Sequence, residues 1–317
     1  MESPLIDVHT HVGVEIQFWL QGHYPYAQDW PTLVRLGTKH QIGRFVVFPM
    51  PSNLSVNLTE LKKGNVVKKD ALENVPYAFE NRRLMVEIEN YFPELSAKAL
   101  PFWMFDPSHE QKAQVAALRA LGEEFRCYGL KTQPTFLKSP ILDLLSEGEC
   151  ILDFAEEKGL PFTIHSSIHP EDPWSQVKDI LTVIEARPGI RFCVAHSCRF
   201  DKPSLDRVAE LPNAWFDCSA HRIACVLGAQ NHPSAAPAAT RFASDYRDPK
   251  VVLHDLAKAY PTKLMWGSDA PFDSYIDEHL QLRSSYDEEA EALFALDKET
   301  VHAIASRNIL KFLNIPS

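Results

Sequence analysis

Leu5-Ile6-Asp7-Val8-His9-Thr10-His11 is the stretch that decides the fold, because an apolar segment runs directly into two histidines. In a β-strand, side chains two residues apart point to the same face. His9 and His11 are therefore expected to project together from one strand end, where two imidazoles can share a cation such as zinc. Alone this His-x-His pair is weak support for a metal site, since paired histidines also occur on ordinary surfaces.

Three further apolar segments end in a side chain that can bind metal. They are Phe162-Thr163-Ile164, which runs into His165, Cys193-Val194-Ala195, which runs into His196, and Met265-Trp266-Gly267-Ser268, which runs into Asp269. A single His after an apolar strand is more often a hydrogen-bonded structural residue. A barrel of parallel strands, however, gathers all its strand ends around one axis. The repeated pattern therefore predicts one polar site built from distant parts of the chain.

Short apolar segments alternate with segments of helical periodicity along the whole sequence, as in proteins whose parallel strands are joined by helices. The predicted strands span 5–8, 44–48, 100–105, 128–132, 162–165, 191–195, 214–218 and 263–267. The predicted helices span 32–40, 77–91, 110–121, 148–158, 174–186, 204–211 and 249–260, followed by 278–295 and 298–313. We expect an α/β fold, a (β/α)8 TIM barrel with extra C-terminal helices, in which 1–317 is a single domain. The segments 49–76 and 219–248 are predicted as long loops at the functional face.

Composition excludes several classes of protein. The 317 residues carry a formal net charge of -10, which disfavours nucleic-acid binding. The six cysteines form no Cys-x-x-Cys pair, so a structural zinc finger is not expected. The sequence shows neither a signal peptide nor an apolar run that could cross a bilayer. These features favour a cytoplasmic protein that acts on small molecules, with no membrane partner.

Four motifs together resemble the metal-dependent amidohydrolase superfamily, in particular its amidohydrolase-related branch. They are DVHTH at 7–11, AHS at 195–197, GSDAPF at 267–272 and RNILKFL at 307–313. The resemblance extends from Ile6 to Phe312. That branch contains hydrolases and also decarboxylases that act on aminocarboxymuconate semialdehyde or on hydroxybenzoates.

The resemblance implies roles for the residues at the strand ends. His9, His11, His165 and Asp269 would bind one divalent metal ion, most often Zn²⁺. His196 and Asp269 would be catalytic, with Asp269 as the general base. The implied activity is hydrolysis of a small organic substrate by metal-activated water. The same residues would also serve a nonoxidative decarboxylase of an aromatic or muconate-like acid, or a metal-binding barrel without catalysis. Dimers are frequent among similar proteins, so the resemblance allows a homodimer, but no sequence feature indicates an interface.

Four side chains are candidates for substrate contact, each with a structural alternative. Lys131 ends the fourth predicted strand, where it could hold an anionic substrate, pair with a carboxylate, or bridge two metals as a carboxylated lysine. Arg222 could bind a substrate carboxylate or form a surface ion pair. Trp19 and Trp103 could pack against the substrate or fill ordinary loop and barrel space. Asp7 shares strand parity with the histidines and is expected either in the site or as a support for a ligand.

Overall fold

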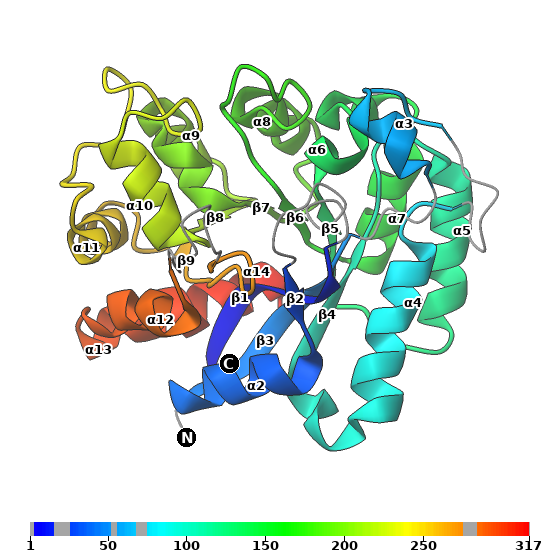
Figure 1. Ribbon diagram of the computed structural model, residues 1–317, viewed down its shortest axis with the longest axis horizontal. Helices are drawn as coiled ribbons and strands as arrows, with labels where there is room; N and C mark the ends of the chain where they lie inside the picture. The colour runs from blue at the N-terminus through cyan, green and yellow to red at the C-terminus, as the bar shows by residue number, and fades with distance from the viewer. Residues whose placement is uncertain (1–2, 16–25, 52–55, 68–74, 275–283, 317) are drawn as a thin grey trace.

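The computed structural model describes residues 3–15, 26–51, 56–67, 75–274 and 284–316, and Figure 1 shows their arrangement. Within them, nine strands form one sheet in the order β2-β1-β3-β4-β5-β6-β7-β8-β9. The strands are β1 (Leu5–Val14), β2 (Ala27–Gln28), β3 (Ile42–Pro49), β4 (Ala99–Met104), β5 (Gly129–Thr132), β6 (Phe162–Ile164), β7 (Phe192–Val194), β8 (Ala214–Asp217) and β9 (Leu264–Met265). Apart from β2, all of them run parallel to their neighbours. Each of the eight predicted strands is present.

The sheet curls until its last parallel strand meets its first. The Val8 amide donates to the Trp266 carbonyl at 3.2 Å, and the Asp269 amide donates to the His9 carbonyl at 2.8 Å. A third bond, from the His11 amide to the Ala270 carbonyl at 2.7 Å, continues this seam. The predicted barrel is therefore confirmed. The two-residue strand β2 was not predicted, because it is too short to show any periodicity.

Helices surround the barrel (Figure 1), and the last of them, at Asn308–Leu313, packs Phe312 against Phe102 in the cluster inside the barrel. They are α2 (Trp30–Lys39), α3 (Leu58–Lys62), α4 (Ala78–Val86), α5 (Gln111–Gly122), α6 (Pro134–Leu137), α7 (Glu149–Lys158), α8 (Val177–Ala186), α9 (Lys202–Glu210), α10 (His221–Ala229), α11 (Pro249–Ala259), α12 (Tyr286–Phe294), α13 (Lys298–His302) and α14 (Asn308–Leu313). Helix α8 shows the principle, since Val177, Ile180 and Ile184 are buried on one stripe. No helix in the described ranges is both long and apolar enough to cross a membrane.

Three predicted segments need correction. The segment 49–76 is not only a loop, because it contains α3. The segment 219–248 is not only a loop either, because it contains α10. The buried face of α10 is made of His221, Ala224, Cys225 and Gly228, which are polar or small, so the apolar stripe that signals a helix is weak. The helix predicted over 278–295 begins at Tyr286, where Ser285 caps it by accepting from the Glu288 amide. Residues 278–283 lie outside the described ranges.

Side chains alternate between the inside of the barrel and the helix layer. One buried cluster, which includes Val8, Phe48 and Phe102, fills the barrel. The larger cluster, which includes Trp103 and Leu118 of α5, lies between sheet and helices. Both clusters leave the carboxyl ends of the strands to polar residues.

Candidate metal centre

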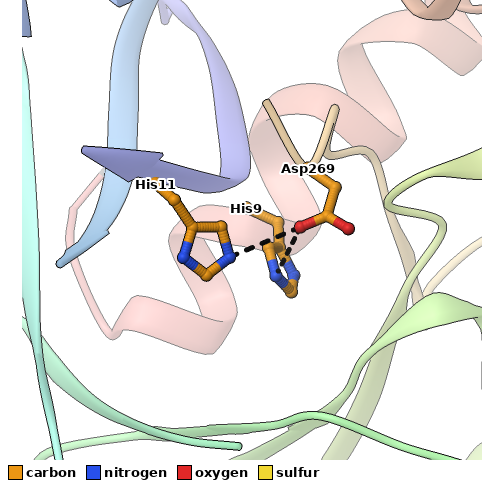
Figure 2. A group of neighbouring side chains, drawn as sticks. All are labelled: His9, His11 and Asp269. Carbon is orange, nitrogen blue, oxygen red and sulfur yellow. Dashed lines mark ion pairs between the residues drawn. The ribbon is translucent and has the colours of Figure 1, made fainter. Parts of the chain in front are cut away.

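His9, His11 and Asp269 lie together where β1 meets the loop after β9 (Figure 2). One ligand atom from each side chain lies within 4.8 Å of the other two. Asp269 Oδ1 is 3.2 Å from His9 Nε2 and 3.4 Å from His11 Nε2. All three residues are buried. Residues far apart in sequence thus converge as the strand-end pattern predicts.

Asp7 supports the positions of His9 and Asp269 through hydrogen bonds to the backbone beside them. Its Oδ1 accepts from the Ser268 amide at 3.0 Å and from the His9 amide at 3.2 Å, and its Oδ2 accepts from the Tyr286 hydroxyl at 3.0 Å. Burial raises the pKa of Asp7 to about 6. The register of β1 shifts between Asp7 and Thr10, which breaks the simple parity with the histidines. Asp7 therefore fixes the two chain segments that carry the candidate ligands.

Asp217, which the sequence analysis missed, orients His9. The Asp217 Oδ2 atom lies 2.9 Å from His9 Nδ1, and both side chains are buried. Burial alone would raise the pKa of Asp217, but electrostatic attraction to His9 and the hydrogen bonds that the carboxylate accepts hold that pKa well below its usual range. With its Nδ1 proton donated to this carboxylate, the neutral tautomer of His9 presents its Nε2 lone pair on the side of Asp269. Asp217 ends β8 as the other site residues end their strands, so the same signal could have identified it.

The donor set fits a divalent cation. Burial, as the largest cause, lowers the pKa of His11 to about 4, so this imidazole is neutral at pH 7. Burial by itself would raise the pKa of Asp269, but His9 and His11 outweigh it and keep this carboxyl ionised. Neutral imidazole nitrogens and a carboxylate oxygen are the ligands that zinc prefers. Among the described residues, His11 Nδ1 is buried without a hydrogen-bond partner, so His11 lacks the kind of support that Asp217 gives to His9.

His165 and His196 form a second part of the site. His165 Nδ1 lies 3.0 Å from His196 Nε2, and His196 Nδ1 lies 3.1 Å from the Ser219 carbonyl oxygen. This order indicates that each ring donates through Nδ1. Burial lowers the pKa of His196 to about 3 and that of His165 well below its usual value, so both rings are neutral. His165 stands apart from the group of three, and its role as a fourth ligand stays a prediction.

Arg199, also absent from the predicted site, reaches His165 from an unusual turn. Its Nη2 lies 3.2 Å from His165 Nε2, and its Nε donates to the Ser166 carbonyl at 2.6 Å. From His196 to Phe200 five consecutive residues have positive φ, between 48° and 63°. Left-handed backbone costs non-glycine residues about 1–2 kcal/mol each, and such strain concentrates at functional sites. No propensity scale predicts this conformation.

The four candidate substrate residues have different outcomes. Lys131 lies at the centre, with Nζ 3.2 Å from His9 Nε2 and no solvent exposure. Burial lowers the pKa of its ammonium to about 8. Arg222 forms the alternative surface ion pair, with Nη2 2.9 Å from Glu288 Oε1. Trp19 lies outside the described residues.

Trp103 requires a correction. The Trp103 ring packs against α5 in the layer between sheet and helices, and a cavity of about 350 Å³ beside it is lined by α5 and α7. The preceding residue, Phe102, is the one that points into the barrel. Alternation along the strand therefore turns Trp103 away from the site, so it is not a substrate contact.

Comparison with solved structures supports the fold. An amidohydrolase from Burkholderia multivorans with bound HEPES is 13% identical, with a TM-score of 0.62, and the match covers 99% of this chain and 100% of that one. A TIM-barrel protein from Bordetella bronchiseptica is 10% identical, with a TM-score of 0.61 over 98% and 99% of the two chains. The 5-carboxyvanillate decarboxylase of Sphingomonas paucimobilis is 10% identical, with a TM-score of 0.58 over 99% of both chains. At these identities the likeness shows the fold alone.

No curated protein matches the chain. The sequence model of the amidohydrolase family, however, matches residues 77–315. That range includes His165, His196 and Asp269 but begins after β1, which carries His9 and His11. Because the match covers most of the sequence, the chain belongs to the amidohydrolase family.

Proposed function

We propose that this protein is a metal-dependent hydrolase of a small organic molecule, acting at the carboxyl ends of the barrel strands. The observation that carries the proposal is the convergence of His9, His11 and Asp269 within 4.8 Å. These three side chains would hold one divalent cation, most simply Zn²⁺. A cation held by such ligands acts as a Lewis acid that polarises a substrate oxygen or activates a water molecule.

The protein's own groups provide the proton transfers. Asp269 is ionised, and its Oδ2 lies 4.0 Å from His196 Nδ1 on the side away from His11. It can accept a proton from a water molecule and return that proton to the leaving group. His196 is neutral and hydrogen-bonded to Ser219, so its orientation is fixed beside this carboxylate. Asp217 and Asp7 hold the reacting groups in place through hydrogen bonds that need no rearrangement during turnover.

A nonoxidative decarboxylase of an aromatic or muconate-like acid is the second candidate. The observation in its favour is that two cationic side chains, Lys131 and Arg199, surround the histidines. Cationic groups in a buried site favour an anionic substrate. The structural neighbour from Sphingomonas paucimobilis is a 5-carboxyvanillate decarboxylase, and its match covers 99% of both chains.

Metal analysis of purified protein tests the proposal. Wild-type protein is expected to bind one equivalent of zinc after removal of metal and reconstitution. His9→Ala, His11→Ala and Asp269→Asn should each lose it, whereas His254→Ala, at an exposed histidine on α11, should retain it. Equal zinc content in all four variants would refute the site.

Product analysis then separates the two activities. A panel of lactones, amides and aromatic acids would be incubated with the zinc-loaded protein in water enriched in heavy oxygen. Incorporation of that oxygen into a product supports hydrolysis. Release of carbon dioxide without incorporation supports decarboxylation, and in that case the hydrolase assignment fails.

A further inference from the structure

We infer that the guanidinium of Arg199 binds a carboxylate group of the substrate, so that the site selects organic acids. The inference rests on the proposed function only in that this carboxylate belongs to a molecule converted at the metal centre. It adds the class of substrate and a residue that recognises it. Both the hydrolase and the decarboxylase reading accommodate an acid.

The first observation is that Arg199 lacks a counter-ion close by. In the part of the chain that the structure describes, no carboxylate oxygen lies within 4.0 Å of its nitrogens. Arg222, by contrast, has Glu288 at 2.9 Å. A partly buried guanidinium without a directly paired carboxylate is costly to desolvate, and a bound anion would reduce that cost.

The second observation is that the guanidinium still has N–H groups to donate. The group carries five N–H donors in one plane. Nε uses one toward the Ser166 carbonyl, and Nη2 directs one toward His165 Nε2. No partner for the Nη1 donors is found among the described residues. Nη1 and the second donor of Nη2 form the edge of the fork that binds a carboxylate through two parallel hydrogen bonds.

The third observation is the charge of the surroundings. A guanidinium stays cationic at neutral pH. The charges of three carboxylates, those of Asp269, Asp172 and Asp217, act on Arg199, but none of the three forms an ion pair with it. Lys131 is a second cation in the same region, since the charge of Arg199 also acts on Lys131. An anion at the open edge of Arg199 would therefore gain a direct ion pair and the attraction of a second positive charge.

The backbone explains why the guanidinium points inward. The left-handed turn from His196 to Phe200 reverses the chain directly after β7, and Asp201 then caps α9. This turn brings Arg199 back over His165, with its Nε fixed on Ser166. The bound carboxylate would consequently lie beside His165, and the rest of the substrate could extend from there toward Asp269.

Binding of simple carboxylates to the metal-free protein tests the inference. Isothermal titration with acetate and with benzoate at pH 7.5 would be compared with the neutral analogues acetamide and benzamide. The variants are Arg199→Met, which keeps an apolar stem without charge, and Arg199→Lys, which keeps charge without the fork. Arg222→Met is the matched control, because this arginine is already paired with Glu288.

We expect at least one carboxylate to bind wild-type protein and Arg222→Met equally, at least tenfold weaker to Arg199→Met, and several-fold weaker to Arg199→Lys. The neutral analogues should not discriminate among the proteins. Circular dichroism checks folding, and if Arg199→Met does not fold, the Arg199→Lys comparison decides. The inference is overturned if neither carboxylate binds wild type, if the neutral analogues bind as tightly, or if the Arg199 and Arg222 variants bind alike.

Zinc content, measured on the same proteins, separates this inference from the proposed function. Carboxylate binding that depends on Arg199 in a protein that takes up no zinc would uphold the carboxylate site and remove the hydrolase proposal. Normal zinc binding, with a carboxylate affinity that the Arg199 variants do not change, would reject the carboxylate site and leave the hydrolase proposal standing.

Discussion

Asp217→Asn is the change that tests most directly how the site is organised. The carboxylate accepts five hydrogen bonds, from His9 Nδ1 at 2.9 Å, the Ser219 hydroxyl at 2.5 Å, the Ser219 amide at 3.0 Å, the His196 amide at 3.1 Å and the Cys193 thiol at 3.4 Å. The amide oxygen of Asn can still accept from Ser219 and His196 at the Oδ1 position. The amide nitrogen, however, would replace Oδ2 and donate to His9 Nδ1. His9 would then carry its proton on Nε2, the atom that faces Asp269.

The expected effect follows from that change of tautomer. Removing a group that orients a ligating histidine typically weakens metal binding about 10–100-fold. At about 1.4 kcal/mol for each factor of ten, the loss is about 1.4–2.8 kcal/mol of metal-binding free energy. The free energy of unfolding should fall by about 1–2 kcal/mol, since a hydrogen bond to a charged group is replaced by a neutral one.

Competition with a chromophoric chelator measures the zinc affinity, and urea denaturation followed by circular dichroism measures stability. Asp206→Asn provides the control, because this carboxylate pairs with Lys202 on the surface of α9. Its zinc affinity should equal that of wild type. If Asp217→Asn bound zinc within twofold of wild type while His9→Ala abolished binding, the tautomer argument would be wrong.

Three further changes probe the surroundings. Lys131→Met should raise zinc affinity, because it removes a positive charge 3.2 Å from His9 Nε2. Reduced zinc binding by this variant, together with the added mass of one carbon dioxide on the Lys131 peptide of wild type, would instead favour a carboxylated lysine. His221→Gln should protect against acid. The buried ring has a pKa of about 4 rather than 6.5, so below pH 6.5 the unfolded chain binds this proton while the folded protein does not. Urea denaturation should therefore show that, between pH 7.5 and 5.0, the free energy of unfolding falls by about 2 kcal/mol less in the variant than in wild type. Equal falls in the two proteins would contradict this argument. Gly267→Ala places a Cβ 2.8 Å from His9 Cβ, so it should cost about 1–3 kcal/mol of stability and lower zinc content. Gly122→Ala in α5, where the nearest neighbour of the new Cβ is 3.9 Å away, should keep zinc content and should raise stability by up to about 1 kcal/mol. If Gly267→Ala were as stable as wild type, the steric argument would be wrong.

Most of the barrel was predictable from sequence because parallel strands covered on both faces are continuous apolar segments. The polar residues that end them, such as His9 and Asp269, were visible for the same reason. Helix α10 was missed because its buried face lacks large apolar side chains. This helix has an ordinary conformation, and it was not predicted because its sequence lacks a clear apolar stripe.

Errors in the site have a different origin. Trp103 was assigned to the pocket without regard to the alternation that places its neighbour Phe102 inside the barrel. Arg199 depends on a left-handed turn whose conformation is set by tertiary contacts rather than by local preference. Asp217 ends its strand in the expected way, but carboxylates that support a ligand look the same in sequence as those that bind metal.

The three candidate ligands straddle the line where the cylinder of strands is joined. His9 and His11 belong to β1, and Asp269 follows β9 (Figure 2). Asp7 accepts a hydrogen bond from Ser268 across 261 positions of sequence. A cation bound by all three would link the first strand of the barrel to the segment that follows the last strand. Because only the joined form presents all three donors, occupancy would strengthen the native state by about 4 kcal/mol at a thousandfold excess over the dissociation constant. The availability of metal would then determine not only turnover but also how often the hydrogen bonds between the first and last strands break.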